Sequence, residues 1–461
     1  MTAISTAQMN ILHALGQSYL DMRRPRLIGR APGRLDVMGG IADYSGSLVL
    51  QLPLTEATYA LVQPRCDGQV VVVSGAVTDL SGPNIVEMPI AEIYRYLADT
   101  TALHQMLTVN PDTAWASYLL GVVAIVARQA NVFLYDGITI VIDSQVPLGK
   151  GVSSSAAIEV ATMRALLALV GHEIDGRTLA MWSQMVENHI VGAPCGIMDQ
   201  MTSACGVANQ LLALRCQPAE LLEPVALPDS IQVWGIDSGV RHAVTGADYT
   251  TVRVAAFMGY RMLTSLLGMP TTIVDGVAKI DDSRWHGYLA NITPSEFMQY
   301  YAQLPNHLDG GSFIRHYQAT HDTVTHVNPH QNYPVRQATA HPIYEHQRVR
   351  LFAALLQHPT MNHERAQLLG ELMYQAHESY NACGLGADAT DAIVAQVRAL
   401  GPAYGLYGAK ITGGGSGGTV AVLGRPDARA IVQDIASQYG TGMVFAGSSD
   451  GAIKVAPVTI E

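Results

Sequence analysis

The sequence predicts an α/β protein of two domains, and three observations support this. The chain has 461 residues, which is long for a single hydrophobic core. Its composition, 49% hydrophobic and 14% charged, is that of a well-buried globular protein. Apolar β-branched runs, such as residues 138–144, alternate along the chain with segments of helical spacing, such as residues 112–129.

Charge and cysteine content argue against several classes of function. The net charge of −11 and pI near 5.8 disfavour nucleic acid or an anionic membrane as partner. The five cysteines are odd in number and form no CxxC pair, which disfavours a disulfide scaffold or a structural zinc site. The longest apolar block, Leu119 to Ala127, is shorter than the ~20 residues that span a bilayer. We expect a cytoplasmic protein with no membrane partner, and the sequence leaves its oligomeric state open.

Local patterns predict the elements in chain order. An amphipathic helix is expected first, and strands are expected on both sides of a turn-rich stretch. A short β-rich run, a helix and a buried strand follow, and a helix then extends to Val170. The predicted ranges are 6–22 (helix), 26–30 and 48–63 (strands), 70–74 (β-rich), 112–129 (helix) and 138–144 (strand).

Residues 29–53 are turn-rich and charged, and they run directly into an apolar segment. Their glycines and Pro32 predict a loop rather than one regular element. Charges held on such a loop indicate a site, because loops on a rigid scaffold commonly carry function. The charged residues concerned are Arg30, Arg34, Asp36 and Asp43. On this stretch alone, a solvated turn with a surface ion pair remains the alternative.

A second informative stretch, residues 147–157, follows the strand expected at 138–144. Glycines come first and a serine cluster next, at the start of a predicted helix. Serines there cap free backbone N–H groups, and the same groups with the helix dipole form an anion pocket. Gly151 follows Lys150 where a Walker-type loop has Ser or Thr, so that motif is absent. Phosphate binding and an ordinary capped helix both remain open.

Two further stretches combine glycines with polar residues. In residues 182–206 a helix carrying Glu187 is followed by a sharp bend, and Asp199 opens the next helix. Each acid also has a plain structural use, Asp199 as a helix N-cap and Glu187 on an exposed helix face. The many glycines of residues 408–419 permit close approach to a ligand or form a flexible hairpin.

The order of these four stretches resembles that of the GHMP kinase superfamily, which includes galactokinases, homoserine kinases and mevalonate kinases. The resemblance runs from about Arg30 to Leu423. Residues 147–157 resemble the family's phosphate loop, and residues 192–200 and 237–242 resemble segments of galactokinases. The resemblance implies a two-domain α/β GHMP kinase fold with the active site between an N-terminal domain, residues 1–210, and a C-terminal domain, residues 211–461.

The resemblance also implies a role for each matching residue. Asp199 corresponds to the catalytic aspartate that takes or steers the proton of the attacking sugar hydroxyl, and Arg34 to the arginine beside it. ATP would be bound by Pro147, Gly149, Lys150, Gly151, Ser153, Ser154, Ser155 and Ala156, and Mg²⁺ by Ser154 and Glu187. Sugar-binding positions would be Asp36, Gly40, Ile41, Asp43, Cys195, Gly196, Asp199, Tyr249 and Gly414. This set suits phosphoryl transfer, which needs positioning and charge neutralisation.

One departure from the galactokinase pattern bears on the sugar. Galactokinases have Glu and His beside the exocyclic hydroxymethyl group, and this chain has Gly40 and Ile41 there. Asp43, which faces the ring hydroxyls in the family, is retained. L-arabinopyranose has the ring stereochemistry of galactose without the hydroxymethyl group, and burying that hydroxyl without partners would cost roughly 1–3 kcal/mol. The chain therefore looks most similar to the L-arabinokinase branch.

The expected function is an ATP- and Mg²⁺-dependent sugar 1-kinase that converts L-arabinose to L-arabinose 1-phosphate. A galactokinase and a uronic-acid 1-kinase are alternatives, the latter disfavoured because residues 39–42 carry no cation for a carboxylate. A non-catalytic sugar and ATP sensor is an alternative of another class, disfavoured because the phosphate loop and Asp199 are intact.

Overall fold

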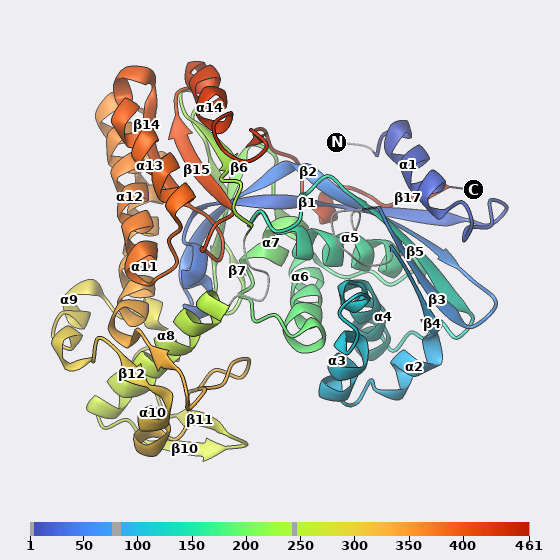
Figure 1. Ribbon diagram of the computed structural model, residues 1–461, viewed down its shortest axis with the longest axis horizontal. Coiled ribbons are helices and arrows are strands. Elements are labelled where there is room, and N and C mark those ends of the chain that lie inside the picture. The colour runs from blue at the N-terminus through green and yellow to red at the C-terminus, as the bar shows by residue number, and fades with distance from the viewer. Residues whose placement is uncertain (1–3, 76–83, 242–246, 461) are drawn as a thin grey trace.

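Two β-sheets and the helices packed on them form most of the computed structural model, which describes residues 4–75, 84–241 and 247–460 (Figure 1). The larger sheet has nine strands and the smaller has four. In Figure 1 the larger sheet lies on the right with both chain ends near it, and the smaller sheet lies at the upper left. A mainly helical region that begins at residue 247 lies below the smaller sheet.

The larger sheet has the strand order β17-β1-β2-β5-β3-β4, and β6 to β8 extend it from β2. β3 and β5 pair in parallel, and β1 and β2 pair antiparallel. β17 pairs with β1, so residues near both ends of the chain meet in this sheet. The strands are β1 (Arg26–Met38), β2 (Leu48–Pro64), β3 (Gln69–Ser74), β4 (Ile85–Pro89), β5 (Gly137–Ser144), β6 (Gln210–Arg215), β7 (Glu220–Leu221), β8 (Val225–Ala226) and β17 (Val458–Ile460).

Helices cover both faces of this sheet. On β5, Ile138, Ile140 and Ile142 belong to the core under α4 and α5, and Val141 belongs to the core under α1. This alternation explains why β5 is apolar throughout, since its two faces are both buried. The helices are α1 (Thr6–Gly16), α2 (Ile90–Arg95), α3 (Thr100–Thr108), α4 (Ser117–Ala130), α5 (Ser154–Leu169), α6 (Gly176–Met185) and α7 (Met198–Cys205).

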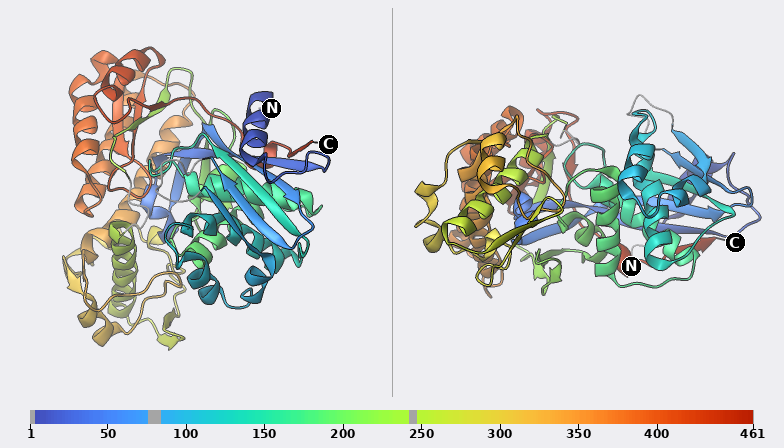
Figure 2. Two further views of the ribbon diagram at one scale, coloured as in Figure 1. Left: turned by 45° about the vertical axis from the view of Figure 1, so that its right-hand side comes forward. Right: turned by 90° about the horizontal axis from the view of Figure 1, so that it is seen from below.

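The smaller sheet has the order β14-β15-β9-β16 and carries α12 and α13 on one side (Figure 2). Leu35 and Val37 of β1 share a core with Val233 and Leu423 of this sheet, so the two sheets are joined by apolar packing. The elements are β9 (Gln232–Asp237), α12 (His363–Ala382), α13 (Asp388–Leu400), β14 (Leu406–Ile411), β15 (Thr419–Gly424), α14 (Arg429–Ala436) and β16 (Val444–Phe445).

Residues 266–340 fold together with two long helices, α8 and α11. Trp285, Phe297, Phe313 and Tyr333 share one apolar core with α8 and α11, and this core also includes Ile41. The elements of the region are α8 (Ala247–Leu266), β10 (Thr271–Val274), β11 (Val277–Ile280), α9 (Pro294–Phe297), β12 (Leu308–Asp309), α10 (Gly310–Tyr317), β13 (Asn332–Tyr333) and α11 (Val335–Leu356).

The prediction that residues 29–53 form a loop is wrong for most of the stretch. β1 runs through it to Met38, with its pairing to β2 shifted between Pro32 and Arg34, and only Gly40–Ser45 forms a turn of 3-10 helix, η1. A Cβ on Gly29 would lie 2.3 Å from the Ala161 carbonyl of α5. The glycine is therefore needed because a helix packs directly on the strand backbone, not because the chain turns.

Other predicted boundaries shift by a few residues. The first helix ends at Gly16 instead of residue 22, and the helix expected from residue 112 begins at Ser117 after a short 3-10 turn. The domain boundary near residue 210 stays a prediction, and β6 to β8 beyond it pair within the larger sheet. No helix in the described part of the chain is both long and apolar enough to cross a membrane.

Candidate active site

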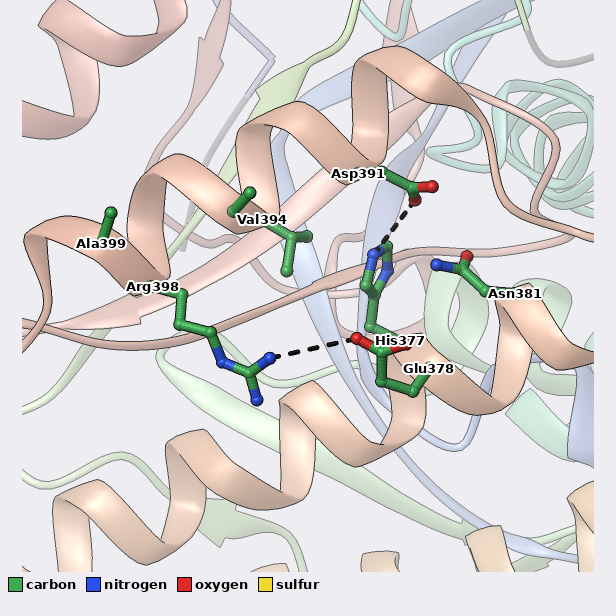
Figure 3. Close-up of a pocket in the computed structure, with 8 residues that line it drawn as sticks. His377, Glu378, Asn381, Asp391, Val394, Arg398 and Ala399 are labelled. Atoms are coloured by element: carbon green, nitrogen blue, oxygen red, sulfur yellow. Dashed lines mark ion pairs between the residues drawn. The ribbon is translucent and has the colours of Figure 1, made fainter.

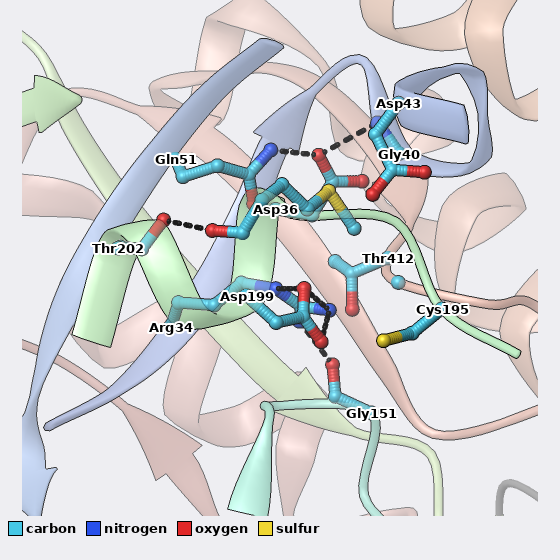
Figure 4. A network of polar contacts seen from close by, with 12 residues as sticks. Arg34, Asp36, Gly40, Asp43, Gln51, Gly151, Cys195, Asp199, Thr202 and Thr412 are labelled. Atoms are coloured by element: carbon cyan, nitrogen blue, oxygen red, sulfur yellow. Dashed lines mark hydrogen bonds and ion pairs between the residues drawn. The ribbon is translucent and has the colours of Figure 1, made fainter. Parts of the chain in front are cut away.

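Arg34 of β1 and Asp199 of α7 form a two-pronged ion pair (Figure 4). Arg34 Nε lies 2.9 Å from Asp199 Oδ1, and Nη2 lies 3.0 Å from Oδ2. Arg34 Nη1 also donates to the Gly151 carbonyl at 2.6 Å. The arginine side chain is 3% exposed and the aspartate side chain 21%, so Asp199 is the more accessible partner of the pair.

The position of Asp199 excludes one alternative that the sequence left open. Ile197 is the N-cap of α7, and Asp199 lies inside the first turn, so it is not the capping residue. A negative charge there is favoured by the helix dipole. Burial opposes the positive charge of Arg34, but the carboxylates of Asp199 and Asp36 outweigh it and raise the arginine pKa.

The predicted phosphate loop leads into α5, which begins at Ser154. Gly149, Gly151 and Ser153 have positive φ values of 69°, 68° and 60°. Ser153 occupies the N-cap position without a side-chain bond to the helix, so the serine cap expected from the sequence is absent. Its buried Oγ has no partner, and the first-turn N–H groups of α5 are left for an anion. This combination fits a bound phosphate group better than an ordinary capped helix.

The glycine-rich loop between β14 and β15 packs directly on the phosphate loop. Thr419 Oγ1 donates to the Lys150 carbonyl at 2.8 Å, and a Cβ on Gly418 would lie 2.9 Å from the same oxygen. The Lys150 ammonium lies 2.8 Å from Asp237 Oδ2, at the end of β9. The glycines thus permit close approach between loops, and Gly414 lies half-buried in this segment.

Three polar side chains, Gln200, Glu187 and Glu159, contact one another close to the start of α5. Gln200 Nε2 lies 2.5 Å from Glu187 Oε2 and 3.3 Å from Glu159 Oε2. Glu187 lies in a π-helical turn, Val186–Val191, and is 8% exposed, so the exposed-face alternative is wrong. Burial, and next the charge of Asp199, raise the pKa of Glu187 to about 7, while a hydrogen bond with Ser155 lowers it.

Asp43 lies in η1, against the loop before α7. Its carboxylate is 4% exposed, and Oδ1 accepts from the Tyr44 N–H at 2.7 Å. A Cβ on Gly196 would lie 1.7 Å from Asp43 Oδ2, so glycine is required at that position. Burial, and next the charge of Asp199, raise the pKa of Asp43 to about 7, although Arg253 opposes the shift. The ring centroid of Tyr249 lies 5.9 Å from that of Tyr44. His242, the last residue of the segment 237–242, lies outside the described residues.

The Cys195 backbone is held by the helical region. Arg253 of α8 donates from Nη1 to the Cys195 carbonyl at 3.1 Å, and its other nitrogens bind Asp322 in a two-pronged pair at 2.9 Å. Burial raises the pKa of the Cys195 thiol well above its usual value, which disfavours the reactive thiolate.

Asp36, expected to bind the sugar, is fully buried and has protein partners on both oxygens. Oδ2 lies 2.6 Å from the Lys410 ammonium, and Oδ1 accepts from the Gln51 side chain at 2.7 Å and from the Gly40 N–H at 3.0 Å. Burial disfavours its charge, but Lys410 and Arg34 outweigh that effect and lower its pKa. The arrangement supports a structural role rather than direct sugar contact.

Gly40 and Ile41 lie at the start of η1, against Tyr380 of α12. The Tyr380 hydroxyl accepts from the Ile41 N–H at 2.9 Å and donates to the Gly413 carbonyl at 2.8 Å. The Ile41 side chain is 1% exposed and belongs to the core around α8 and α11. Ile41 therefore forms part of a packed apolar wall next to Asp43.

Lys410, Glu159, Tyr380 and Arg253 were not singled out from the sequence. Two of them had a usable signal, because Lys410 is the charged residue in the apolar strand β14 and Glu159 lies in the apolar face of α5. Tyr380 and Arg253 are found only from the fold, since their partners are hundreds or tens of residues away.

A cavity of about 350 Å³ opens between α12 and α13, apart from these residues (Figure 3). His377 Nε2 lies 3.1 Å from Asp391 there, and Arg398 faces Glu378. None of the predicted site residues lines it. The Arg34–Asp199 pair, and not this cavity, is therefore the centre of the candidate site.

Family models match three parts of the chain. The GHMP kinases N terminal domain matches residues 117–207, the GHMP kinases C terminal domain matches residues 352–441, and the galactokinase galactose-binding signature matches residues 19–64. The chain is 42% identical to an L-arabinokinase of Arabidopsis thaliana across 93% of this chain and 46% of that protein. It is 31% identical to a galactokinase of Chloroflexus aurantiacus across 61% of this chain and 66% of that protein. The chain thus spans less than two thirds of either relative.

Solved structures share this fold. Lactococcus lactis galactokinase complexed with galactose aligns over 97% of this chain and 99% of its own, with a TM-score of 0.70 at 18% identity. Methanococcus jannaschii mevalonate kinase aligns over 92% and 98%, with a TM-score of 0.55 at 14% identity. These likenesses confirm the predicted two-domain α/β fold.

Proposed function

Because the chain belongs to the GHMP kinase family, near the L-arabinokinases and galactokinases, we propose that it is an ATP-dependent sugar 1-kinase acting on L-arabinose. The observation that supports this is the Arg34–Asp199 pair, in which the half-buried Asp199 shares an arginine with the Gly151 carbonyl of the phosphate loop. A carboxylate next to a bound phosphate donor can accept or steer the proton of an attacking hydroxyl. We expect the reaction to take place in the cytoplasm, as free cysteines allow.

The chain's own residues supply the remaining parts of the reaction. Backbone N–H groups at the start of α5 would hold the phosphates of ATP, and Arg34 would support negative charge near the transferred group. Asp43 would accept hydrogen bonds from ring hydroxyls of the sugar. Each contact acts by positioning or by charge neutralisation, which is what phosphoryl transfer requires.

The residues also fit a divalent cation. Glu187 and Asp199 are two carboxylates close enough for the charge of one to raise the pKa of the other, and a cation would relieve that repulsion. Among the described residues no group of three His, Cys, Asp or Glu side chains forms a metal site, so serine hydroxyls and ATP phosphates would complete the ligands. Glu187 and Ser154 are the predicted ligands, and Ser155 bonds with Glu187. Bound Mg²⁺ would neutralise phosphate charge.

The preference for a pentose is supported by Gly40 and Ile41. A Cβ on residue 40 would lie 1.7 Å from the Tyr380 hydroxyl, so a glutamate at this position does not fit with Tyr380. The neighbouring wall is apolar, because Ile41 packs among α8 and α11. A hydroxymethyl group there would find no charged or imidazole partner on residues 40 and 41. The plant relative named L-arabinokinase supports the same preference.

A sugar panel tests the proposal. The protein is mixed with ATP, Mg²⁺ and each of L-arabinose, D-galactose and D-galacturonate, and ADP release and the phosphorylated carbon are measured. We expect kcat/KM to be highest for L-arabinose, with phosphate on the anomeric oxygen. A higher kcat/KM for galactose than for L-arabinose would contradict the preference for a pentose. If none of the sugars in the panel caused ADP release, the non-catalytic sensor would be favoured over a kinase.

A further inference from the structure

Tyr380 bridges two site segments that are far apart in the sequence. Its side chain is fully buried in the last turn of α12. One hydroxyl accepts from the Ile41 N–H at 2.9 Å and donates to the Gly413 carbonyl at 2.8 Å. The hydroxyl therefore satisfies a donor on η1 and an acceptor on the glycine-rich loop at once.

Each end of this bridge lies next to one of the two proposed ligands. Ile41 is two residues before Asp43, on the side where the sugar would bind. Gly413 lies against the nucleotide side, because a Cβ there would be 3.0 Å from the Gly151 carbonyl and 3.3 Å from Arg34 Nη2. The Tyr380 hydroxyl and the glycine-rich loop therefore link η1, next to the proposed sugar site, to the phosphate loop.

The hydroxyl has little freedom to move. Gly40, with φ of +42°, leaves no room for a Cβ, which would lie 1.7 Å from the oxygen. The Lys410 ammonium lies 5.5 Å from the centroid of the Tyr380 ring, and His341 packs edge-on at 5.2 Å. The backbone just beyond Tyr380 holds the same loop, since Leu385 O accepts from the Ser416 N–H at 2.7 Å.

We propose that Tyr380 is a positioning residue that couples sugar binding to nucleotide binding. A nucleotide bound to the phosphate loop restricts the motion of the glycine-rich loop. Because the Tyr380 hydroxyl is bonded to both segments, the motion of η1 is restricted too, and less conformational entropy is lost when the sugar binds. By linkage the sugar tightens nucleotide binding by the same factor. The inference rests on the proposed function, which places a sugar near Asp43 and a nucleotide at the phosphate loop.

Tyr380→Phe is the direct test, because it removes the hydroxyl and keeps the ring. Calorimetry measures the Kd of L-arabinose with and without the non-hydrolysable analogue adenylyl imidodiphosphate, and the reverse titration checks reciprocity. We expect the wild-type protein to show a coupling factor of about 5- to 150-fold. In Tyr380→Phe the factor should fall towards one, with KM raised for both substrates and kcat at saturation changed less.

Tyr333→Phe is the matched control. Tyr333 is equally buried in the core around α8 and α11, and its hydroxyl accepts from the Asn328 N–H at 2.9 Å, away from both ligands. This variant should keep wild-type coupling. Equal loss of coupling in both variants, unchanged coupling in Tyr380→Phe, or a wild-type factor of one would each overturn the inference.

Gly40→Ala gives a second approach to the same bridge. The added Cβ would displace the Tyr380 hydroxyl from its hydrogen bonds, so the coupling factor should fall in this variant too. A coupling factor equal to that of the wild type in Gly40→Ala would contradict the proposed role of Tyr380. The two proposals fail separately. If sugar binding is coupled to nucleotide binding but no sugar is phosphorylated, the proposed kinase activity is wrong and the role of Tyr380 stands. If a sugar is phosphorylated but the two binding events are uncoupled, the kinase activity stands and the role of Tyr380 is wrong.

Discussion

Two ion pairs on the same strand have opposite exposures. Arg34 and Asp36 are two residues apart on β1, and each binds a partner brought in by another element. The Arg34–Asp199 pair leaves its carboxylate 21% exposed. In the Asp36–Lys410 pair both side chains are fully buried. A pair of a carboxylate and a cation is thus partly accessible to solvent at Arg34 and fully buried at Asp36, two residues further along β1.

The difference teaches what each pair can do. A buried pair contributes little net stability compared with apolar residues, but loss of one partner leaves a charge stranded. The sealed pair therefore fixes β1 against β14 and supports η1 through the Gly40 N–H. The open pair keeps a carboxylate that can meet a substrate hydroxyl. Four substitutions test this division.

Asp199→Asn should have the largest effect, on turnover. The amide oxygen can still accept one hydrogen bond from Arg34, but the amide nitrogen cannot accept the second one, and the group no longer takes a proton. We expect kcat to fall by about 10²- to 10⁴-fold, and Tm to fall as well because the buried Arg34 loses its ion pair. Steady-state kinetics with the preferred sugar measures this, with the exposed Glu223→Gln as control. Turnover near that of the wild type would move the proton role to another residue.

Lys410→Met should have the next largest effect, on stability. It leaves the Asp36 carboxylate buried without its cation, which typically costs about 3–5 kcal/mol of unfolding free energy. Urea unfolding measures the loss. The double variant Asp36→Asn/Lys410→Met should recover much of it, because no charge is then stranded. A loss below about 1 kcal/mol in the single variant would contradict the division, since ordinary exposed pairs cost that little.

Asp43→Asn should change the pH dependence of stability. Burial raises the pKa of Asp43 from 3.8 to about 7, so between these values the folded state holds a proton that the unfolded state has released. The free energy of unfolding therefore falls as pH rises through this window and levels off above it. Glu187, also raised to about 7, adds a slope of the same sign. Urea unfolding at pH 5 and 7.5 should show a smaller difference in the variant than in the wild type.

Glu159→Gln should have the smallest effect, and it tests the limit of the comparison. Glu159 is fully buried beside Gln200, and burial, followed by the charge of Glu187, raises its pKa well above the usual value. The raised pKa favours the neutral carboxyl, so a neutral amide of similar shape should change stability by less than about 1 kcal/mol. A loss as large as that of Lys410→Met would mean that Glu159 is charged.

The sequence by itself determined the order of the glycine-rich segments, and the family resemblance that this order carries predicts the roles of Arg34, Asp199 and the phosphate loop. Glycine, serine and acidic residues in a fixed order are local signals, and they can be recognised without knowledge of the fold. The same local reasoning placed a loop at residues 29–53, where β1 runs. It failed because Gly29 of β1 makes room for α5, a helix that packs on the strand from far along the chain.

Only the tertiary structure decided which charges are open and which are sealed. Asp36 and Asp199 are both acids in glycine-rich stretches, and nothing local separates them. Lys410 reaches Asp36 from a strand more than 370 residues later, and Tyr380 reaches Ile41 from a helix almost as distant. Burial and partner choice depend on which segments pack together, so they follow from long-range contacts that no local pattern records.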